Sequence, residues 1–225
     1  MRTLLMLAAL FTVAFTQSAM AGTWRDNFDD GDYDGWGAWR GTWAVVEGAL
    51  IGESGQLAAL VMGDESWSDY TVEIDVMVAG ELDPPAQFPQ AGLSVRNHFP
   101  ARPGHYESIF ISFGAWNIMV NHVTAAWGDN IKKSVAFDVE ESSWHRFRAV
   151  ADGTDFATYL DGELISEFVD DTGPLGKVAL HVNGLEAHFD NVVIVGDDVP
   201  DGGSLRPVDS GGKLTAVWAS LKSGA

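Results

Sequence analysis

The predicted fold rests on Arg25-Asp-Asn-Phe-Asp-Asp-Gly-Asp-Tyr-Asp-Gly-Trp36, read together with Ala187-His-Phe-Asp-Asn-Val-Val-Ile-Val195 near the other end of the chain. Each stretch sets an apolar Phe beside Asp and Asn, and the second alternates as a half-buried strand does. Pairing of the two stretches in one sheet closes the fold. It also gathers carboxylate and amide oxygens, the ligands that Ca²⁺ prefers, from Asn27, Asp29, Asp30 and Asp190.

The segment Asp30-Gly-Asp-Tyr-Asp-Gly35 copies the first half of an EF-hand calcium loop. Its twelfth position is Gly41, where an EF-hand has a bidentate Glu, and no helical pattern flanks it. The sequence therefore favours an Asp/Gly turn, stabilised by Asx hydrogen bonds and by the conformational freedom of Gly. Metal binding by this loop itself stays open as the alternative.

The N-terminus has the pattern of a secretory signal. An apolar run from Leu4 to Phe15 is followed by Gln17-Ser-Ala-Met-Ala21, which predicts a signal peptide over 1–21 cleaved between Ala21 and Gly22. The run is short for a membrane span and no stop-transfer pattern follows it. We expect a secreted or periplasmic protein with no membrane span.

Composition narrows the possible partners. The 225 residues carry a net charge of −19, with 13 Lys and Arg against 32 Asp and Glu. Nucleic acids and anionic membranes are bound through basic patches, so neither is an expected partner. Cysteine is absent, so stability must come from the core, alone or together with a bound metal, rather than from disulfides.

Short strands separated by turns fill the sequence. The clearest is 71–78, where Val72, Ile74, Val76 and Val78 share one face. Glu47-Gly48 and Asp161-Gly162 are typical of tight hairpin turns. Further strands are predicted over 57–62, 92–97, 106–113, 116–123, 134–138, 144–151, 156–160, 164–169, 177–182 and 188–195. This pattern indicates an all-β antiparallel sandwich or barrel over residues 22–196.

The C-terminal region differs from the rest. Residues 197–212 are rich in Asp, Gly and Pro and predict a linker. The tail 213–225 contains Leu214, Val217, Trp218 and Leu221, which would lie on one side of a short helix. We interpret it as a tail that docks or frays, with a sorting or partner-binding peptide as the alternative.

The nine tryptophans divide by position. Trp36, Trp43, Trp67 and Trp144 stand at strand starts and are expected in the core. Trp116 and Trp127 have polar or Gly neighbours and are the candidates for stacking on sugar rings.

The chain resembles the concanavalin A-like lectin/glucanase superfamily, and more narrowly exported laminin G-like and keto-disaccharide hydrolase-like domains of bacteria. The resemblance covers about residues 24–195 and rests on the order of its motifs, which are Asp-Asn-Phe-Asp-Asp-Gly, Trp43-Ala-Val-Val-Glu-Gly48, Trp67-Ser-Asp-Tyr70, Gly92-Leu-Ser-Val-Arg96, Tyr159-Leu-Asp-Gly162 and Phe189-Asp-Asn-Val. It implies a two-sheet jelly roll whose concave sheet often faces carbohydrate.

Two kinds of enzyme occur among these relatives. The laminarinase-like glycosidases carry paired acids on one strand, but Glu73-Ile-Asp75 does not continue into their motif. The keto-disaccharide hydrolase-like domains carry a Gly-x-x-x-Arg strand followed by Tyr-Glu, which matches Arg96 and Glu107. An Arg and a carboxylate there could bind sugar hydroxyls or stabilise an enolate. A simple Arg96–Glu107 ion pair is the alternative.

The sequence therefore predicts an exported, non-catalytic module that binds glycan or a cell-surface partner, with ligand contacts at Arg96, Tyr106, Trp116 and Trp127. A keto-disaccharide hydrolase-like enzyme acting through Arg96 and Glu107 is the alternative. The resemblance also implies a structural Ca²⁺ bound by Asn27, Gly48 and Asp190.

Overall fold

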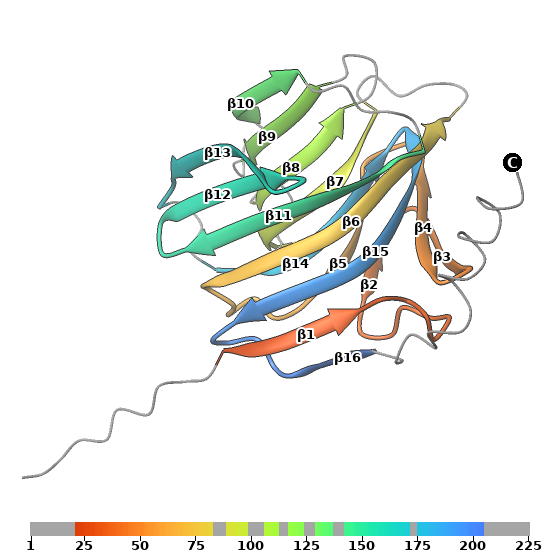
Figure 1. Cartoon of the computed structure of the whole chain (residues 1–225), viewed down its shortest axis with the longest axis horizontal. Coiled ribbons are helices and arrows are strands. Elements are labelled where there is room, and N and C mark those ends of the chain that lie inside the picture. Colours follow the sequence, from red (N-terminus) through yellow and green to blue (C-terminus); the bar gives the residue numbers. More distant parts are fainter. Residues whose placement is uncertain are drawn as a thin grey trace, which may run out of the picture.

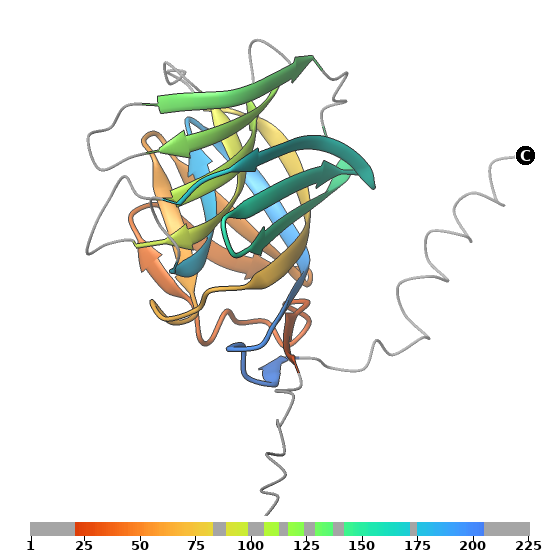
Figure 2. The same cartoon turned by 90° about the vertical axis from the view of Figure 1, so that its left-hand side faces the viewer.

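The computed structural model describes residues 21–82, 89–98, 106–112, 117–123, 129–136, 142–171 and 175–204, with the backbone alone for most of 106–136. These residues form sixteen strands and no helix, in two sheets that face each other (Figures 1 and 2). None of the described segments is therefore a helix long and apolar enough to span a membrane. The prediction of an all-β, two-sheet antiparallel jelly roll is confirmed.

Sheet A has seven strands in a row and two more beside them. The row is β13 (Glu163–Val169), β12 (Asp155–Leu160), β11 (Trp144–Asp152), β6 (Tyr70–Glu81), β15 (Leu185–Gly196), β1 (Gly22–Asp26) and β16 (Gly202–Ser204). The others are β4 (Ala49–Ser54), which pairs with β15, and β3 (Thr42–Val46), which pairs with β4.

Sheet B has seven strands. Their order is β10 (Asp129–Ala136), β9 (Asn117–Val123), β8 (Tyr106–Ser112), β7 (Gln90–Asn97), β14 (Lys177–Asn183), β5 (Ala58–Met62) and β2 (Gly37–Trp39). Among the described strand pairs of both sheets, only β1 with β16 is parallel.

The core lies between the sheets and follows the predicted alternation. Val72, Ile74 and Val76 of β6 are fully buried. Leu93 of β7 and Leu180 of β14 face them from sheet B in the same apolar cluster. Because successive side chains of a strand point to opposite faces, the residues between these point away from the core.

The two stretches that were predicted to pair do so. β1 is antiparallel to β15, with Asp26 opposite Val192. The buried Asp26 carboxylate accepts hydrogen bonds from the Phe28 amide (2.9 Å), from Trp36 Nε1 (3.1 Å) and from Ser204 Oγ (3.0 Å). This one carboxylate therefore joins the first strand, the acidic loop and β16, and burial raises its pKa.

The turns have the conformations that their residues predict. Glu47 and Gly48 have φ of 53° and 76°, and Asp161 and Gly162 have φ of 48° and 85°, as in type I′ hairpins. In the acidic loop the Asp34 amide donates to Asp32 Oδ1 at 3.0 Å, which is an Asx turn.

Three predictions need correction. The predicted linker begins too early, because residues 202–204 form β16 on β1. The strand predicted over 134–138 is β10 and begins at Asp129. Trp144 is 44% exposed on the outer face of β11, whereas Trp36, Trp43 and Trp67 lie in the core as predicted. The signal peptide, residues 205–212 and the tail lie outside the described residues and stay predictions.

Candidate functional site

The side of sheet B that points away from the core is the candidate site, and we call it the sheet B face. Its described residues alternate with core residues along β5, β7 and β14 and include Ala59, Val61, Gln90, Gly92, Ser94, Ala179, His181 and Asn183. Trp39 of β2 and Leu57 pack against Ala59, Val61 and Ala179. Small side chains therefore occupy the middle of this face.

A chain of hydrogen bonds crosses the centre of the sheet B face. Asn97 Nδ2 donates to Ser94 Oγ at 2.8 Å, and Ser94 Oγ lies 2.6 Å from His181 Nε2. All three side chains are fully buried. Burial lowers the pKa of His181 to about 3, because a charged imidazole is not solvated there. His181 is therefore neutral at physiological pH and shares a hydrogen bond with the Ser94 hydroxyl through Nε2.

The described side chains of the sheet B face on β5, β7 and β14 are small or polar, and most of them are uncharged. Gln90 and Asn183 are opposite each other in the β7–β14 pair and are partly exposed. Two charged side chains are described at the margins of this face. Lys177, at the other end of β14, is paired with Glu65 at 3.6 Å, and the Arg40 guanidinium lies 4.4 Å from the centroid of the Trp39 ring. Amides, hydroxyls and a neutral imidazole donate and accept hydrogen bonds, which suits an uncharged polar ligand.

Arg96 does not lie on this face. The register shift between β7 and β14 sets Val95 and Arg96 opposite the single residue Val178, which is a β-bulge, and Arg96 has a φ of 51°. The bulge turns its side chain inward, where Nε and Nη2 donate to the Ser68 carbonyl at 3.1 and 2.9 Å.

The guanidinium of Arg96 also contacts an aromatic ring and a carboxylate. It lies 4.7 Å from the centroid of the Phe156 ring and 3.4 Å from Asp69 Oδ1, and its side chain is 1% exposed. Arg96 is therefore buried and bonded away from the sheet B face, and its predicted part in ligand binding or catalysis stays a prediction. Its role here is to hold the bulge and one end of the sandwich together.

The other predicted ligand residues are only partly described. The backbones of Tyr106 and Glu107 lie in β8, with Glu107 opposite Val95 and His122. Their side chains, and Trp116 and Trp127 entirely, lie outside the described residues. Contacts of Tyr106, Trp116 and Trp127 with ligand, and of Glu107 with Arg96, stay predictions.

The three predicted calcium ligands flank one gap in the strand pairing of sheet A. One edge of β15 pairs with β1 from Val192 onward and with β4 up to Phe189. Asn27 follows β1, Gly48 precedes β4, and Asp190 lies in the gap between them, where Asn191 has a φ of 51°. The described residues contain no group of three or more His, Cys, Asp or Glu side chains arranged for a metal. A site there would depend on carbonyl and amide oxygens beside Asp190, which Ca²⁺ accepts.

The outer face of sheet A is charged and ion-paired. Arg146 Nε and Nη2 donate to the two oxygens of Asp75 at 2.7 and 2.8 Å. Arg148 Nε lies 3.7 Å from Glu73 Oε1. The acids of Glu73-Ile-Asp75 are thus ion-paired with arginines of β11.

Ser94, Asn97 and His181 were missed by the sequence analysis. A signal for two of them exists, because Ser94 interrupts Leu93 and Val95, and His181 interrupts Leu180 and Val182. A polar residue within an apolar strand needs a hydrogen-bond partner. The sequence does not say that the two partners are each other, since that depends on the register of β7 against β14.

The comparisons with known proteins agree with this architecture. The fold is that of the concanavalin A-like jelly rolls, as three solved structures show. The carbohydrate-binding module CBM66 from Bacillus subtilis is 21% identical with a TM-score of 0.61, over 70% of this chain and 93% of that one. The β-glucanase of Bacillus licheniformis is 16% identical with a TM-score of 0.55, over 77% and 97%. The laminarinase catalytic domain of Thermotoga petrophila RKU-1 is 12% identical with a TM-score of 0.55, over 78% and 97%.

The family assignment is more specific than the assignment of the fold. The model of the 3-keto-alpha-glucoside-1,2-lyase-like domain matches residues 23–195, so the chain belongs to this family. A sequence comparison with curated proteins gives no match.

Proposed function

We propose that this protein is an exported, non-catalytic module that binds uncharged glycan on the sheet B face. The observation that carries the proposal is the composition of that face, where the partly exposed Gln90 and Asn183 offer hydrogen bonds and the buried network of Ser94, Asn97 and neutral His181 adds no charge. Sugar hydroxyls both donate and accept, so they match such a surface. The likeness of the fold to a carbohydrate-binding module supports the same conclusion.

Glycan binding is tested with the chain beginning at Gly22, first on a glycan array and then by calorimetry with the best neutral oligosaccharide. Gln90→Ala and Asn183→Ala remove side chains at the partly exposed part of the face, and we expect each to weaken binding about tenfold. Arg148→Ala, on the outer face of sheet A, is the control and should bind as the unchanged protein does. Failure to bind any glycan, or equal loss in the control, contradicts the proposal.

Catalysis on a keto-sugar is the second candidate, favoured by the family match. Removing a proton beside a carbonyl requires a general base with a pKa near the working pH. His181 is fully buried and its pKa is only about 3, so it is a poor base. Glu107 is the candidate from the sequence. Conversion of a 3-keto-disaccharide by the purified chain, lost in Glu107→Gln, would establish the enzyme and displace the non-catalytic proposal.

We also propose that the domain is exported after cleavage at Ala21 and that it binds a structural Ca²⁺. Gly22 is the first residue of β1, so cleavage there leaves the sheet complete. The mass of the exported protein tests the cleavage site. The gap at Asp190 supports the metal, with Asn27 and Gly48 supplying further oxygens. Ca²⁺ bound there would hold the ends of β1 and β4 against β15.

A further inference from the structure

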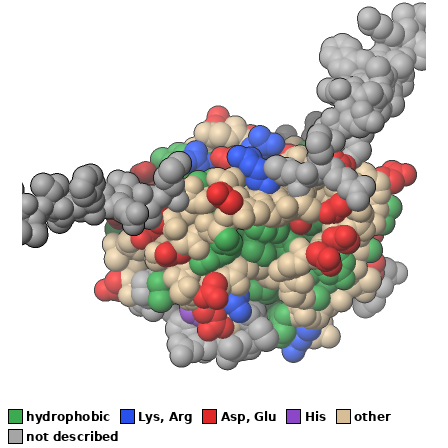
Figure 3. Space-filling model, turned by 90° about the horizontal axis from the view of Figure 1, so that it is seen from below, with side chains coloured by type: hydrophobic (Ala, Val, Ile, Leu, Met, Phe, Trp, Pro, Cys, Tyr) green, Lys and Arg blue, Asp and Glu red, His purple; other side chains and the backbone are tan. Residues whose placement is uncertain are grey.

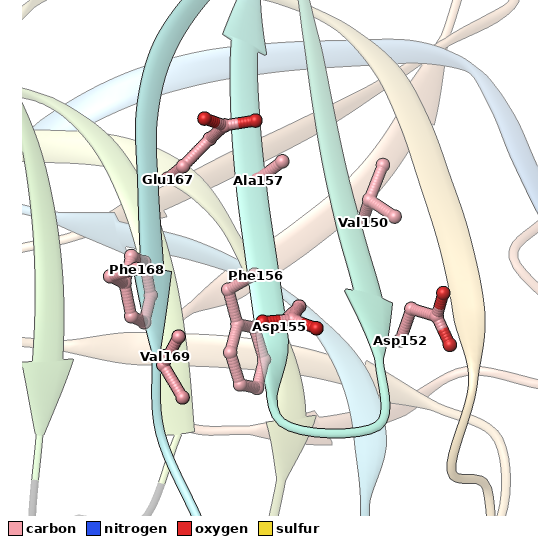
Figure 4. Close-up of a pocket in the computed structure, with 8 residues that line it drawn as sticks. All are labelled: Val150, Asp152, Asp155, Phe156, Ala157, Glu167, Phe168 and Val169. Carbon is pink, nitrogen blue, oxygen red and sulfur yellow. The ribbon is translucent and has the colours of Figure 1, made fainter.

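A hollow lies over β11, β12 and β13 at one edge of sheet A. It has a volume of about 450 Å³ and is lined by Val150, Asp152, Asp155, Phe156, Ala157, Glu167, Phe168 and Val169 (Figure 4). The small Ala157 creates it, because its cross-strand partners are the larger Val150 and Glu167. The volume is in the range of binding pockets for small molecules or single side chains.

The lining combines apolar surface with negative charge. Val150, Ala157 and Val169 supply its apolar side chains on the outer face, while the rings of Phe156 and Phe168 lie on the core side of the same strands, stacked with centroids 5.1 Å apart and planes 7° apart. The ionisable residues of the lining are three carboxylates, those of Asp152, Asp155 and Glu167, and none is basic. Val169 at the rim is 68% exposed. Such a hollow fits an apolar side chain that is accompanied by a positive charge.

We propose that this hollow binds the C-terminal segment of the same chain, residues 213–222, through Trp218 with Lys213 or Lys222 near the carboxylates. Residues 205–225 carry Arg206, Lys213 and Lys222 against one acid, Asp209, in a chain of net charge −19. The segment is thus positive where most of the protein is negative. Its apolar residues match the apolar part of the hollow.

The segment can reach the hollow. β16 ends at Ser204 on one edge of sheet A, and β13 lies at the other edge, six strand spacings away (Figure 1). At about 4.8 Å per spacing this distance is about 29 Å. An extended chain from Ser204 to Trp218 spans up to about 47 Å, which leaves length to spare.

The test uses the absence of native cysteine. Val169→Cys at the rim of the hollow is combined with Ser220→Cys in the otherwise complete chain, and disulfide formation is followed under mild oxidation. The control pair is Val46→Cys with Ser220→Cys, because Val46 is also exposed (49%) but belongs to β3. We expect the Val169 pair to close at least about tenfold faster, because docking raises the local concentration of the tail thiol.

A second pair of variants tests the contacts. Glu167→Gln should slow closure of the Val169 pair, and so should 0.5 M NaCl. Glu163→Gln, on the same strand and outside the lining, should leave the rate unchanged. Equal rates for the Val169 and Val46 pairs overturn the proposal. So do cross-links that form only between molecules, since the occupant is then another copy of the chain.

Discussion

The outer faces of the two sheets differ in the kind of polar group they carry. On sheet A the groups are charged and form ion pairs at the surface, as Arg146 does with Asp75 and Arg148 does with Glu73. On sheet B they are neutral and buried, as Ser94 and His181 are. Acidic side chains surround hydrophobic ones on the face of the molecule seen in Figure 3.

This difference bears on function. Charged pairs in water contribute little stability and keep a surface hydrated. Neutral hydrogen-bonding groups beside small apolar residues are cheaper to desolvate when an uncharged ligand binds. The sheet B face is thus the better candidate for recognition, and the outer face of sheet A serves solubility. Substitutions on each of the two outer faces test this difference.

The largest effect is expected from Arg96→Ala. The change removes a guanidinium that is buried against Phe156 and bonded to the Ser68 carbonyl, and we expect a loss of about 3 kcal/mol or more in the free energy of unfolding. Arg148→Ala is the matched control on sheet A and should cost less than about 1 kcal/mol. Urea unfolding of both variants gives the comparison. Similar losses would mean that Arg96 contributes no more to the free energy of unfolding than a surface arginine does.

Sequence reasoning predicted most of the fold and less of the site. The alternation of Val72, Ile74 and Val76 identifies the core face of β6, because alternate residues of a strand lie on the same face and only one face of each sheet in a sandwich is buried. The orientation of Arg96 depends on a bulge, which is a property of two strands together and not of one segment. β16 has the sequence Gly-Gly-Ser and pairs through its backbone, so it leaves no side-chain pattern to recognise.

Calcium gives the next largest effect. Because Ca²⁺ at Asp190, Asn27 and Gly48 would bind only the folded state, a hundredfold excess over Kd stabilises by about 2.7 kcal/mol. We expect EDTA to lower the melting temperature, added Ca²⁺ to restore it, and Asp190→Ala to remove the response. Equal melting curves in EDTA and in millimolar Ca²⁺ would rule out the metal and leave Asp190 with the Asn191 amide as its hydrogen-bond partner, at 2.6 Å.

Acid should act on the sheet B face through His181. Its pKa is lowered from about 6.5 in the unfolded chain to about 3 in the folded protein. The stability that depends on neutral His181 is therefore complete above pH 6.5 and falls by up to about 1.4 kcal/mol per unit between pH 6.5 and 3. His181→Gln should be less stable than the unchanged protein at pH 7 and lose less on acidification.

The measurement for His181 is the free energy of unfolding at several pH values from 7 to 4. Asp26, whose pKa burial raises, acts in the opposite direction, since its folded state gains stability as pH falls through that raised pKa. It is unchanged in both proteins, so the difference between them isolates His181. Parallel curves for the two proteins would show that His181 takes up its proton in the folded state.

The smallest effect is expected on the outer face of sheet A. Arg146→Ala breaks a two-pronged pair with Asp75, but the Arg146 side chain is 55% exposed and water replaces the lost hydrogen bonds. The loss in the free energy of unfolding should stay below about 1 kcal/mol and shrink further in 0.5 M NaCl, because salt screens exposed charges. Glycan affinity should not change. Asp75 also accepts a hydrogen bond from Asn191 Nδ2 at 2.9 Å. A loss as large as that of Arg96→Ala, or one that persists in salt, would show that Asp75 belongs to a network on sheet A that stabilises the fold as much as Arg96 does.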